Sequence, residues 1–143
     1  MQVMQILKDK GTAVTTMPGD ALVADAVRLL NEQRIGSIVI TNRQGEIAGI
    51  LSERDVVHAL AERGPILLDA RVADLMTRNV FTCTPDTSLE ELMRQMTQRR
   101  IRHLPVIDGG QLCGIISIGD VVKNRLMELE TEATTLRDYI GGR

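Results

Sequence analysis

Hydrophobic and polar positions follow the same order of patterns in the two halves of this chain. In the first half, a short β-type segment at about residues 13–16 ends at a proline, and apolar residues recur at helical spacing over about 21–33. Two apolar runs at about 36–41 and 46–51 predict strands, and about 53–62 predicts a second helix. The second half gives the matching order at about 80–83, 87–98, 102–107, 112–117 and 118–140. The pattern therefore predicts two βαββα units.

Turn and cap residues mark the ends of these segments. Asn42-Arg43-Gln44-Gly45 joins the first pair of predicted strands, and Asp108-Gly109-Gly110 joins the second. Asp20 and Thr87 are the expected N-caps of the helices at 21–33 and 87–98, because their side chains can accept a hydrogen bond from the first helical turn. Gly64-Pro65 is expected to end the helix at 53–62.

The two halves also align residue by residue. Thr15-Thr16-Met17-Pro18 lies over Thr82-Cys83-Thr84-Pro85, and Gly49-Ile50-Leu51-Ser52 lies over Gly114-Ile115-Ile116-Ser117. The segments that precede the two units are also similar, as a comparison of residues 3–7 with 72–76 shows. One such unit buries too little surface to be stable alone. We therefore expect two repeats, packed sheet to sheet with pseudo-twofold symmetry around one shared core.

The predicted fold class is α/β, of the α+β type, with an N-terminal helix and an extended C-terminal helix. We expect the first repeat and its lead-in helix at residues 1–63, a connection at 64–71, the second repeat at 72–123 and a helical extension at 124–143.

Composition narrows the classes of function. The net charge is −2 and the signs are interspersed, and Phe81 and Tyr139 are the only aromatic residues, which disfavours nucleic-acid binding. No apolar run is long enough to span a bilayer, and the N-terminus has no signal-peptide pattern, so we expect a cytoplasmic protein. No zinc-type Cys/His spacing and no nucleophile–base constellation occurs, so neither a metal site nor catalysis is predicted.

One motif occurs at the junction of the last strand and the last helix of each half. Ser52 is followed by Arg54 and Asp55, and Ser117 is followed by Gly119 and Asp120. The pattern Ser-x-x-Asp is close to a capping box, in which both side chains only stabilise the start of a helix. The same geometry could instead bind a phosphate at the helix N-terminus and a ribose diol at the aspartate. The spacing leaves both interpretations open.

Taken in order and found twice, these elements resemble the CBS domain, which is named after cystathionine β-synthase. The resemblance rests on the short strand and proline, the helix, the glycine turn and the final Gly-Φ-Φ-Ser-x-x-Asp, where Φ is apolar, and it covers about residues 1–123. Two such domains in tandem resemble the arrangement called a Bateman module. The stretch from Arg102 to Gly110 looks like the second copy in small stand-alone bacterial CBS proteins.

The resemblance implies a bound adenosine-containing ligand (AMP, ADP, ATP, NAD or S-adenosylmethionine) in the clefts between the repeats, with no catalytic cofactor. It assigns the ribose to Asp55 and Asp120 and the phosphates to Ser52, Ser117 and Arg54. The adenine would lie among Thr15, Ile38, Thr82 and Pro105. Arg102 and His103 match positions that often face the phosphates, although a solvated strand edge with a partly buried histidine explains them equally well.

The two halves differ at these positions. Gly36-Ser37 stands where the second half has Arg102-His103, and Gly119 stands where the first half has Arg54. We therefore expect two clefts that are not equivalent.

The last helix carries apolar residues at heptad spacing, namely Val122, Leu126, Leu129, Ala133, Leu136 and Ile140. They could pack on the helix's own domain or form the contact of a homodimer. The sequence thus predicts a ligand sensor that acts through an unidentified effector protein. The alternative is a dimeric scaffold without a ligand, and an enzyme acting on nucleotides has little support.

Overall fold

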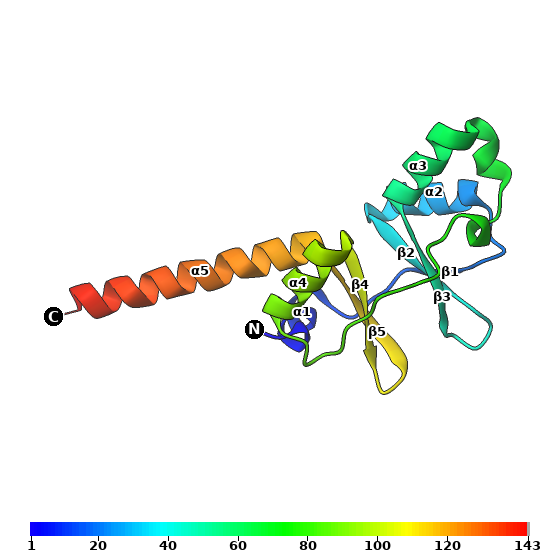
Figure 1. Cartoon of the computed structure of the whole chain (residues 1–143). Helices are drawn as coiled ribbons and strands as arrows, with labels where there is room; N and C mark the ends of the chain where they lie inside the picture. Colours follow the sequence, from blue (N-terminus) through cyan, green and yellow to red (C-terminus); the bar gives the residue numbers. More distant parts are fainter. Residues whose placement is uncertain (143) are drawn as a thin grey trace.

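The computed structural model describes residues 1–142 and contains two similar halves, each with a small β-sheet covered by helices (Figure 1). The elements of the first half are α1 (Val3–Lys10), β1 (Thr16–Pro18), α2 (Val23–Gln33), β2 (Ser37–Thr41), β3 (Ile47–Ser52) and α3 (Glu53–Arg63). Two 3₁₀ helices, η1 (Pro65–Asp69) and η2 (Val72–Asp74), form most of the connection. The second half contains α4 (Leu89–Arg99), β4 (His103–Asp108), β5 (Gln111–Ser117) and α5 (Ile118–Gly141). The predicted α+β class is confirmed.

The two sheets share one plan but differ in their first strand. In the first sheet, β1 runs parallel to β2, which pairs antiparallel with β3. In the second sheet, β4 pairs antiparallel with β5, and the predicted strand at 80–83 is reduced to a single bridge between Cys83 and Val106. Cys83 N–H donates to the carbonyl of Pro105 at 3.0 Å, and its own carbonyl accepts from Ile107 N–H at 2.8 Å. The first strand of the first half lies at 16–18, which is later than the predicted 13–16.

The predicted N-caps Asp20 and Thr87 are wrong. The helix α2 begins after Leu22, whose side chain makes no capping bond, and α4 begins after Ser88, whose hydroxyl accepts from Glu91 N–H at 3.1 Å. The reason is pairing with distant segments. Leu22 forms a bridge with Arg71, and Ser88 forms one with Gln2, so the backbone stays extended to these points and the helices begin later.

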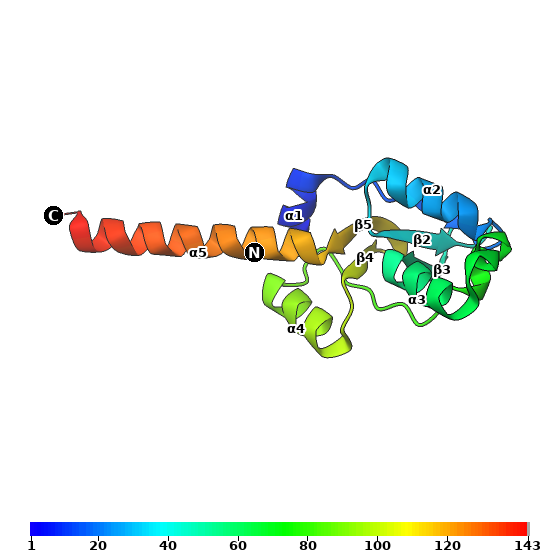
Figure 2. The ribbon, with the colours of Figure 1, turned by 90° about the horizontal axis from the view of Figure 1, so that it is seen from above.

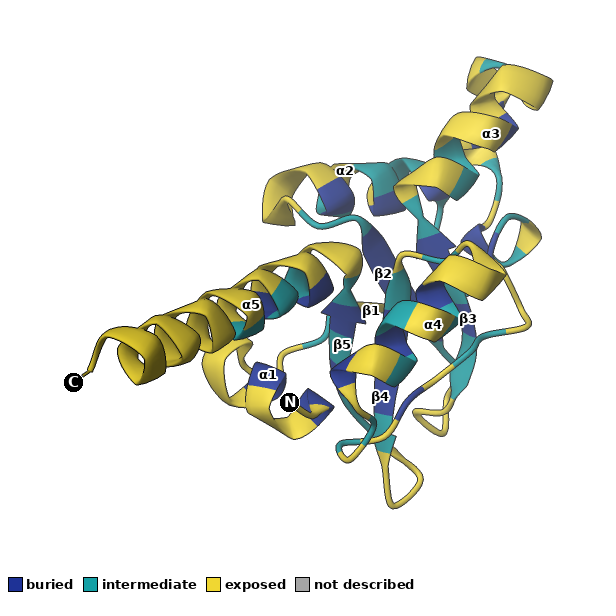
Figure 3. Ribbon diagram, turned by 60° about the vertical axis from the view of Figure 1, so that its left-hand side comes forward, coloured by how far each residue is buried: buried dark blue, intermediate teal, exposed yellow. Residues whose placement is uncertain are grey.

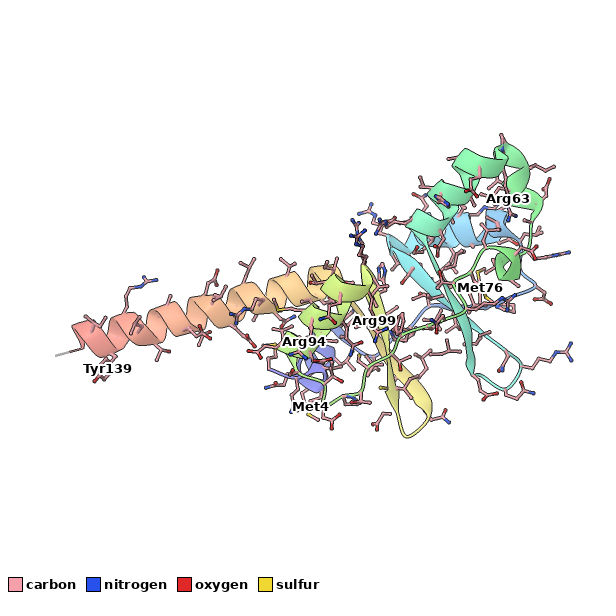
Figure 4. All side chains as sticks on the ribbon, in the orientation of Figure 1. Met4, Arg63, Met76, Arg94, Arg99 and Tyr139 are labelled. Carbon is pink, nitrogen blue, oxygen red and sulfur yellow. The ribbon has the colours of Figure 1, made fainter. Side chains whose placement is uncertain are left out.

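Each lead-in segment packs against the repeat that it does not precede in the sequence. Val3, Ile6 and Leu7 of α1 belong to the buried cluster of the second repeat. The corresponding Val72 and Met76 belong to a cluster of the first repeat, and Figure 4 shows Met76 beside the first sheet. The α1 helix therefore completes the second repeat although it comes first in the chain.

The buried side chains do not form the single core that the sequence led us to expect. They fall into one cluster in the second repeat and two in the first, of which the smaller lies among α2, α3 and the connection and contains no strand residue. The two sheets meet through a smaller number of residues. Val39 is 0% exposed but points away from the cluster that holds its neighbours Ile38 and Ile40, because side chains alternate along a strand. Pro105, at the equivalent position of β4, is buried in the same way between Leu104 and Val106.

The helix α5 is the longest element and extends far beyond the second sheet (Figure 2). Its first turns cover the second repeat with Val121 and Asn124, whereas its far half is exposed on every side (Figure 3). The predicted extension ends at residue 143, which lies outside the described residues. Among residues 1–142, no helix has both the length and the apolar character needed to cross a membrane.

Candidate functional site

The two Ser-x-x-Asp motifs lie at the N-termini of α3 and α5, at the end of the sheets opposite the hairpin turns (Figure 1). Ser52 Oγ accepts from Asp55 N–H at 3.1 Å, while Asp55 Oδ2 accepts from Ser52 N–H at 2.9 Å. In the second repeat, the matching distances between Ser117 and Asp120 are 3.2 Å and 2.9 Å. Both motifs are complete capping boxes, which confirms the capping interpretation. Their role in ligand binding stays a prediction.

Each capped helix is also hydrogen-bonded to the residue that precedes the first strand of the adjacent hairpin. Glu53 N–H donates to the carbonyl of Gly36 at 2.9 Å, and Ile118 N–H donates to the carbonyl of Arg102 at 2.8 Å. These bonds use two of the N–H groups that a helix leaves without an intrahelical partner. They also hold the residues before β2 and β4 beside the two aspartates, so the same backbone geometry is built twice.

The two aspartates differ in their charged neighbours. Lys10, the last residue of α1, donates from Nζ to Asp120 Oδ2 at 2.6 Å and to the carbonyl of Ile115 at 2.8 Å. No cation contacts Asp55 among the described residues. Burial acts to raise the pKa of Asp120, but hydrogen bonds from Lys10 and Ser117 outweigh it and hold the pKa below its ordinary value.

His103 lies where the second repeat meets the first, beside Gly36. A side chain at Gly36 would meet its imidazole, with a distance of 3.0 Å from the Cβ position to Nε2, so the start of β4 faces the residue before β2 in the other half. Burial lowers the pKa of His103. The nearby carboxylates of Glu53 and Asp120 act to raise this pKa, and the charges of Lys10 and Arg102 act to lower it further.

This environment predicts a pH dependence of stability. Because the pKa of His103 is below 6.5 in the folded protein, the unfolded chain binds more protons as the pH falls through that value, and the free energy of unfolding decreases. We expect the stability of the wild type to fall between about pH 7.5 and about pH 5, and His103→Gln to reduce this slope. Chemical denaturation at a series of pH values measures it.

The control for this measurement is His58→Gln, because His58 is the other histidine and lies on the exposed face of α3, where it faces Glu62 at 3.2 Å. The lowered pKa of Asp120 also makes stability depend on pH, but this contribution is lost only at lower pH, below the ordinary carboxylate pKa of 3.8. Parallel pH profiles for the wild type and His103→Gln would contradict the prediction.

The other predicted ligand residues lie in different surroundings. Thr15 is half-buried and hydrogen-bonded to Gln33, whereas Thr82, Arg54 and Arg102 are exposed. Ile38 is wholly buried in the core of the first repeat, so no part of this residue is open to a ligand. Pro105 is buried between the sheets.

Sequence reasoning missed Lys10, Gly36 and Glu53 as members of this group of residues. The similarity of the two lead-in segments held a signal for Lys10. If Val3 is aligned with Val72, Lys10 aligns with Asn79, so a cation stands in one half where the other half has a neutral side chain.

Neither Asp55 nor Asp120 lines either of two hollows on the molecule. One of about 390 Å³ lies between the halves near the hairpin turns, and Arg78 is among the residues that line it. Thr82 also lines it and is the only one of the predicted ligand residues that does. The other, of about 580 Å³, follows the apolar face of α5 from Ile118 to Glu130. No group of His, Cys, Asp and Glu side chains in the described part of the chain could hold a metal ion.

Comparison with known proteins finds the CBS domain twice, at residues 6–62 and 72–126. The crystal structure of a CBS-domain containing protein from Agrobacterium tumefaciens is 42% identical with a TM-score of 0.86, and the match covers 87% of this chain and 99% of that one. A mitochondrial CBS domain-containing protein of Arabidopsis thaliana is 34% identical, over 98% of this chain and 72% of its own length. A CBS domain protein from Pyrobaculum aerophilum, complexed with AMP, is 25% identical with a TM-score of 0.78, over 92% of this chain and 99% of that one.

Proposed function

This chain belongs to the CBS-domain family and carries two copies of the domain, and from this premise we propose that it is a non-catalytic regulatory module that binds an adenosine-containing ligand between its repeats. A relative of the same fold is complexed with AMP, which supports this class of ligand. AMP, ADP, ATP, NAD and S-adenosylmethionine are the candidates. The proposal keeps the sequence-based prediction of a cytoplasmic protein.

The observation that carries the proposal is the state of the two aspartates. In each capping box the serine N–H contacts only Oδ2, and among the described residues no hydrogen bond to Oδ1 of either Asp55 or Asp120 is present. A half-buried carboxylate oxygen with spare acceptor capacity suits the hydroxyl groups of a ribose. Gly119, whose Cβ position has only Ser117 Oγ nearby at 3.6 Å, leaves open space over the start of α5.

The test is calorimetry with AMP, ATP, NAD and S-adenosylmethionine, at concentrations up to millimolar. We expect at least one of these ligands to bind, and we expect Asp55→Ala and Asp120→Ala each to weaken binding in its own cleft by about 10-fold to 100-fold, since each removes a hydrogen bond to a charged group. Asp25→Ala is the control, because Asp25 is an exposed carboxylate of α2 that pairs with Arg28. The Asp25→Ala protein is expected to bind each ligand with the affinity of the wild type.

The alternative is a structural scaffold, and the exposed apolar face of α5 favours it. In that case no ligand in the panel binds, and the aspartate substitutions only lower the ligand-free stability by roughly 0.5–2 kcal/mol, as lost helix caps do. Because α5 begins at the Ser117–Asp120 motif and continues as one helix along this face, the sensor and a contact between two copies can coexist in the same chain. We therefore propose a homodimer through α5, with a separate effector protein that responds to the ligand-dependent change.

A further inference from the structure

We propose that Lys10 makes the cleft at Asp120 selective for ligands that carry a phosphate, whereas the cleft at Asp55 also accepts the neutral nucleoside. This inference rests on the proposed function and assigns a different specificity to each of its two sites. The observations that carry it are the contacts of the two aspartates, which are alike except for the lysine at the end of α1.

The first step is the acceptor capacity of the two carboxylates. Asp55 Oδ2 accepts one hydrogen bond, from Ser52 N–H at 2.9 Å. Asp120 Oδ2 accepts three, from Ser117 N–H at 2.9 Å, Ser117 Oγ at 3.0 Å and Lys10 Nζ at 2.6 Å. A carboxylate oxygen has two lone pairs. Among the described residues, Oδ1 is free in both aspartates. A ribose diol that donates one hydroxyl to each carboxylate oxygen therefore finds room at Asp55, but at Asp120 its second hydroxyl must displace a donor from Oδ2.

The second step is which donor leaves. The Ser117 N–H is part of the capping box and cannot leave without opening the start of α5. Lys10 lies on a flexible four-carbon side chain, although its helix is fixed by Val3, Ile6 and Leu7 in the core of the second repeat. The Ser117 hydroxyl can turn its proton away, but the Ser117 N–H and Lys10 then still occupy both lone pairs of Oδ2. Lys10 is therefore the group that a ribose displaces. The side chain swings away while α1 stays in place.

The third step is the cost of releasing this lysine. The ammonium group would lose its carboxylate partner while it stays near His103 and Arg102. Burial is the main cause of the lowered pKa of His103, and the charges of Lys10 and Arg102 lower this pKa further, so these basic groups are close enough to act on one imidazole. A phosphate provides a new anionic partner for the ammonium, whereas a neutral nucleoside provides none. Only the phosphorylated ligand can then occupy the Asp120 cleft with high affinity.

The first repeat has no such device. At the position equivalent to Ile115, Ile50 pairs through its backbone with Thr77, with both hydrogen bonds at 2.9 Å. The carbonyl that accepts from Lys10 in one half thus accepts from a backbone N–H in the other. No side-chain cation takes part in that pairing, so Asp55 is open to the ribose of a neutral nucleoside.

The experiment compares AMP and adenosine by calorimetry in variants that leave one cleft intact. Asp55→Asn isolates the Asp120 cleft, and Asp120→Asn isolates the Asp55 cleft; asparagine keeps an oxygen that can accept from the serine N–H, so the helix starts are preserved. In the Asp55→Asn protein we expect AMP to bind at least about tenfold more tightly than adenosine. Adding Lys10→Gln is expected to strengthen adenosine binding, weaken AMP binding and remove this preference.

Lys8→Gln is the matched control, because Lys8 is an exposed lysine of the same helix. It is expected to leave the preference intact, and Lys10→Gln in the Asp120→Asn protein is expected to change nothing. If the Asp120 cleft prefers AMP equally with lysine or with glutamine at position 10, the role of Lys10 is overturned and the proposed function stands. Binding of neither AMP nor adenosine to the wild-type protein overturns the role of Lys10, and the proposed function fails with it if ATP, NAD and S-adenosylmethionine do not bind either. Each variant is first shown to unfold cooperatively.

Discussion

Replacement of Gly49 with alanine is expected to lower the free energy of unfolding by about 2–3 kcal/mol, in the upper part of the range for overpacked cores. A Cβ atom at this position would lie 2.6 Å from Met76 Sδ and 2.9 Å from the backbone carbonyl of Thr77. The sulfur can move, but the carbonyl is held by the pairing of Thr77 with Ile50. The substitution therefore forces the second lead-in segment away from the first sheet.

Gly114 offers the matched comparison, since it is the equivalent glycine of the second repeat. A Cβ atom there would lie 2.7 Å from Cδ2 of Leu7, and its three nearest atoms all belong to that side chain. The end of a leucine side chain can move aside, so we expect Gly114→Ala to cost at least about 1 kcal/mol less than Gly49→Ala. Urea denaturation of both variants measures the difference. Equal losses, or a larger loss for Gly114→Ala, would show that the lead-in at 72–77 is not held as rigidly as its hydrogen bonds indicate.

Self-association of the wild-type chain through α5 is the second large effect that we expect. Leu129 and Leu136 are 43% and 59% exposed, and both belong to the heptad series that runs along this helix. A heptad series on one face is complementary to a second copy of itself, so two chains can bury both faces in one symmetric contact. The double substitution Leu129→Glu with Leu136→Glu would place carboxylates in that contact and is expected to weaken association at least about a hundredfold.

Sedimentation velocity over a series of concentrations measures this association. Thr135→Glu serves as the control, because Thr135 is an exposed residue of α5 outside the heptad series, and this substitution adds a carboxylate to the same helix. Its association is expected to match that of the wild type. A wild-type mass that stays monomeric at every concentration would contradict the proposed homodimer, and so would equal weakening by the control.

The sequence by itself determined the elements that depend on near neighbours. Each hairpin was predictable because its turn residues separate two apolar β-branched runs, and the structure has both hairpins with a bulge at the same place in each. The capping boxes at Ser52 and Ser117 were predictable because their partners lie three residues away. The duplication was visible because both halves carry these local signals in the same order.

Tertiary structure decided which distant segments meet. The start of α2 was predicted too early because Leu22 pairs with Arg71, and no local pattern reports a partner so far along the chain. The same holds for the first lead-in, which packs on the second repeat, and for Ile38, which the local strand pattern could not assign to one face of its sheet.

The two candidate clefts show the same division most clearly. The sequence placed a serine and an aspartate at the start of each second helix, and comparison of the halves predicted that the clefts differ. The charge that separates them comes from Lys10, more than a hundred residues from Asp120 in the chain. A contact of this kind depends on the packing of Ile6 and Leu7 under the second repeat, which fixes where the end of α1 lies. Local sequence specifies the residues of each cleft, and the exchange of the lead-in segments specifies which of the two aspartates is paired.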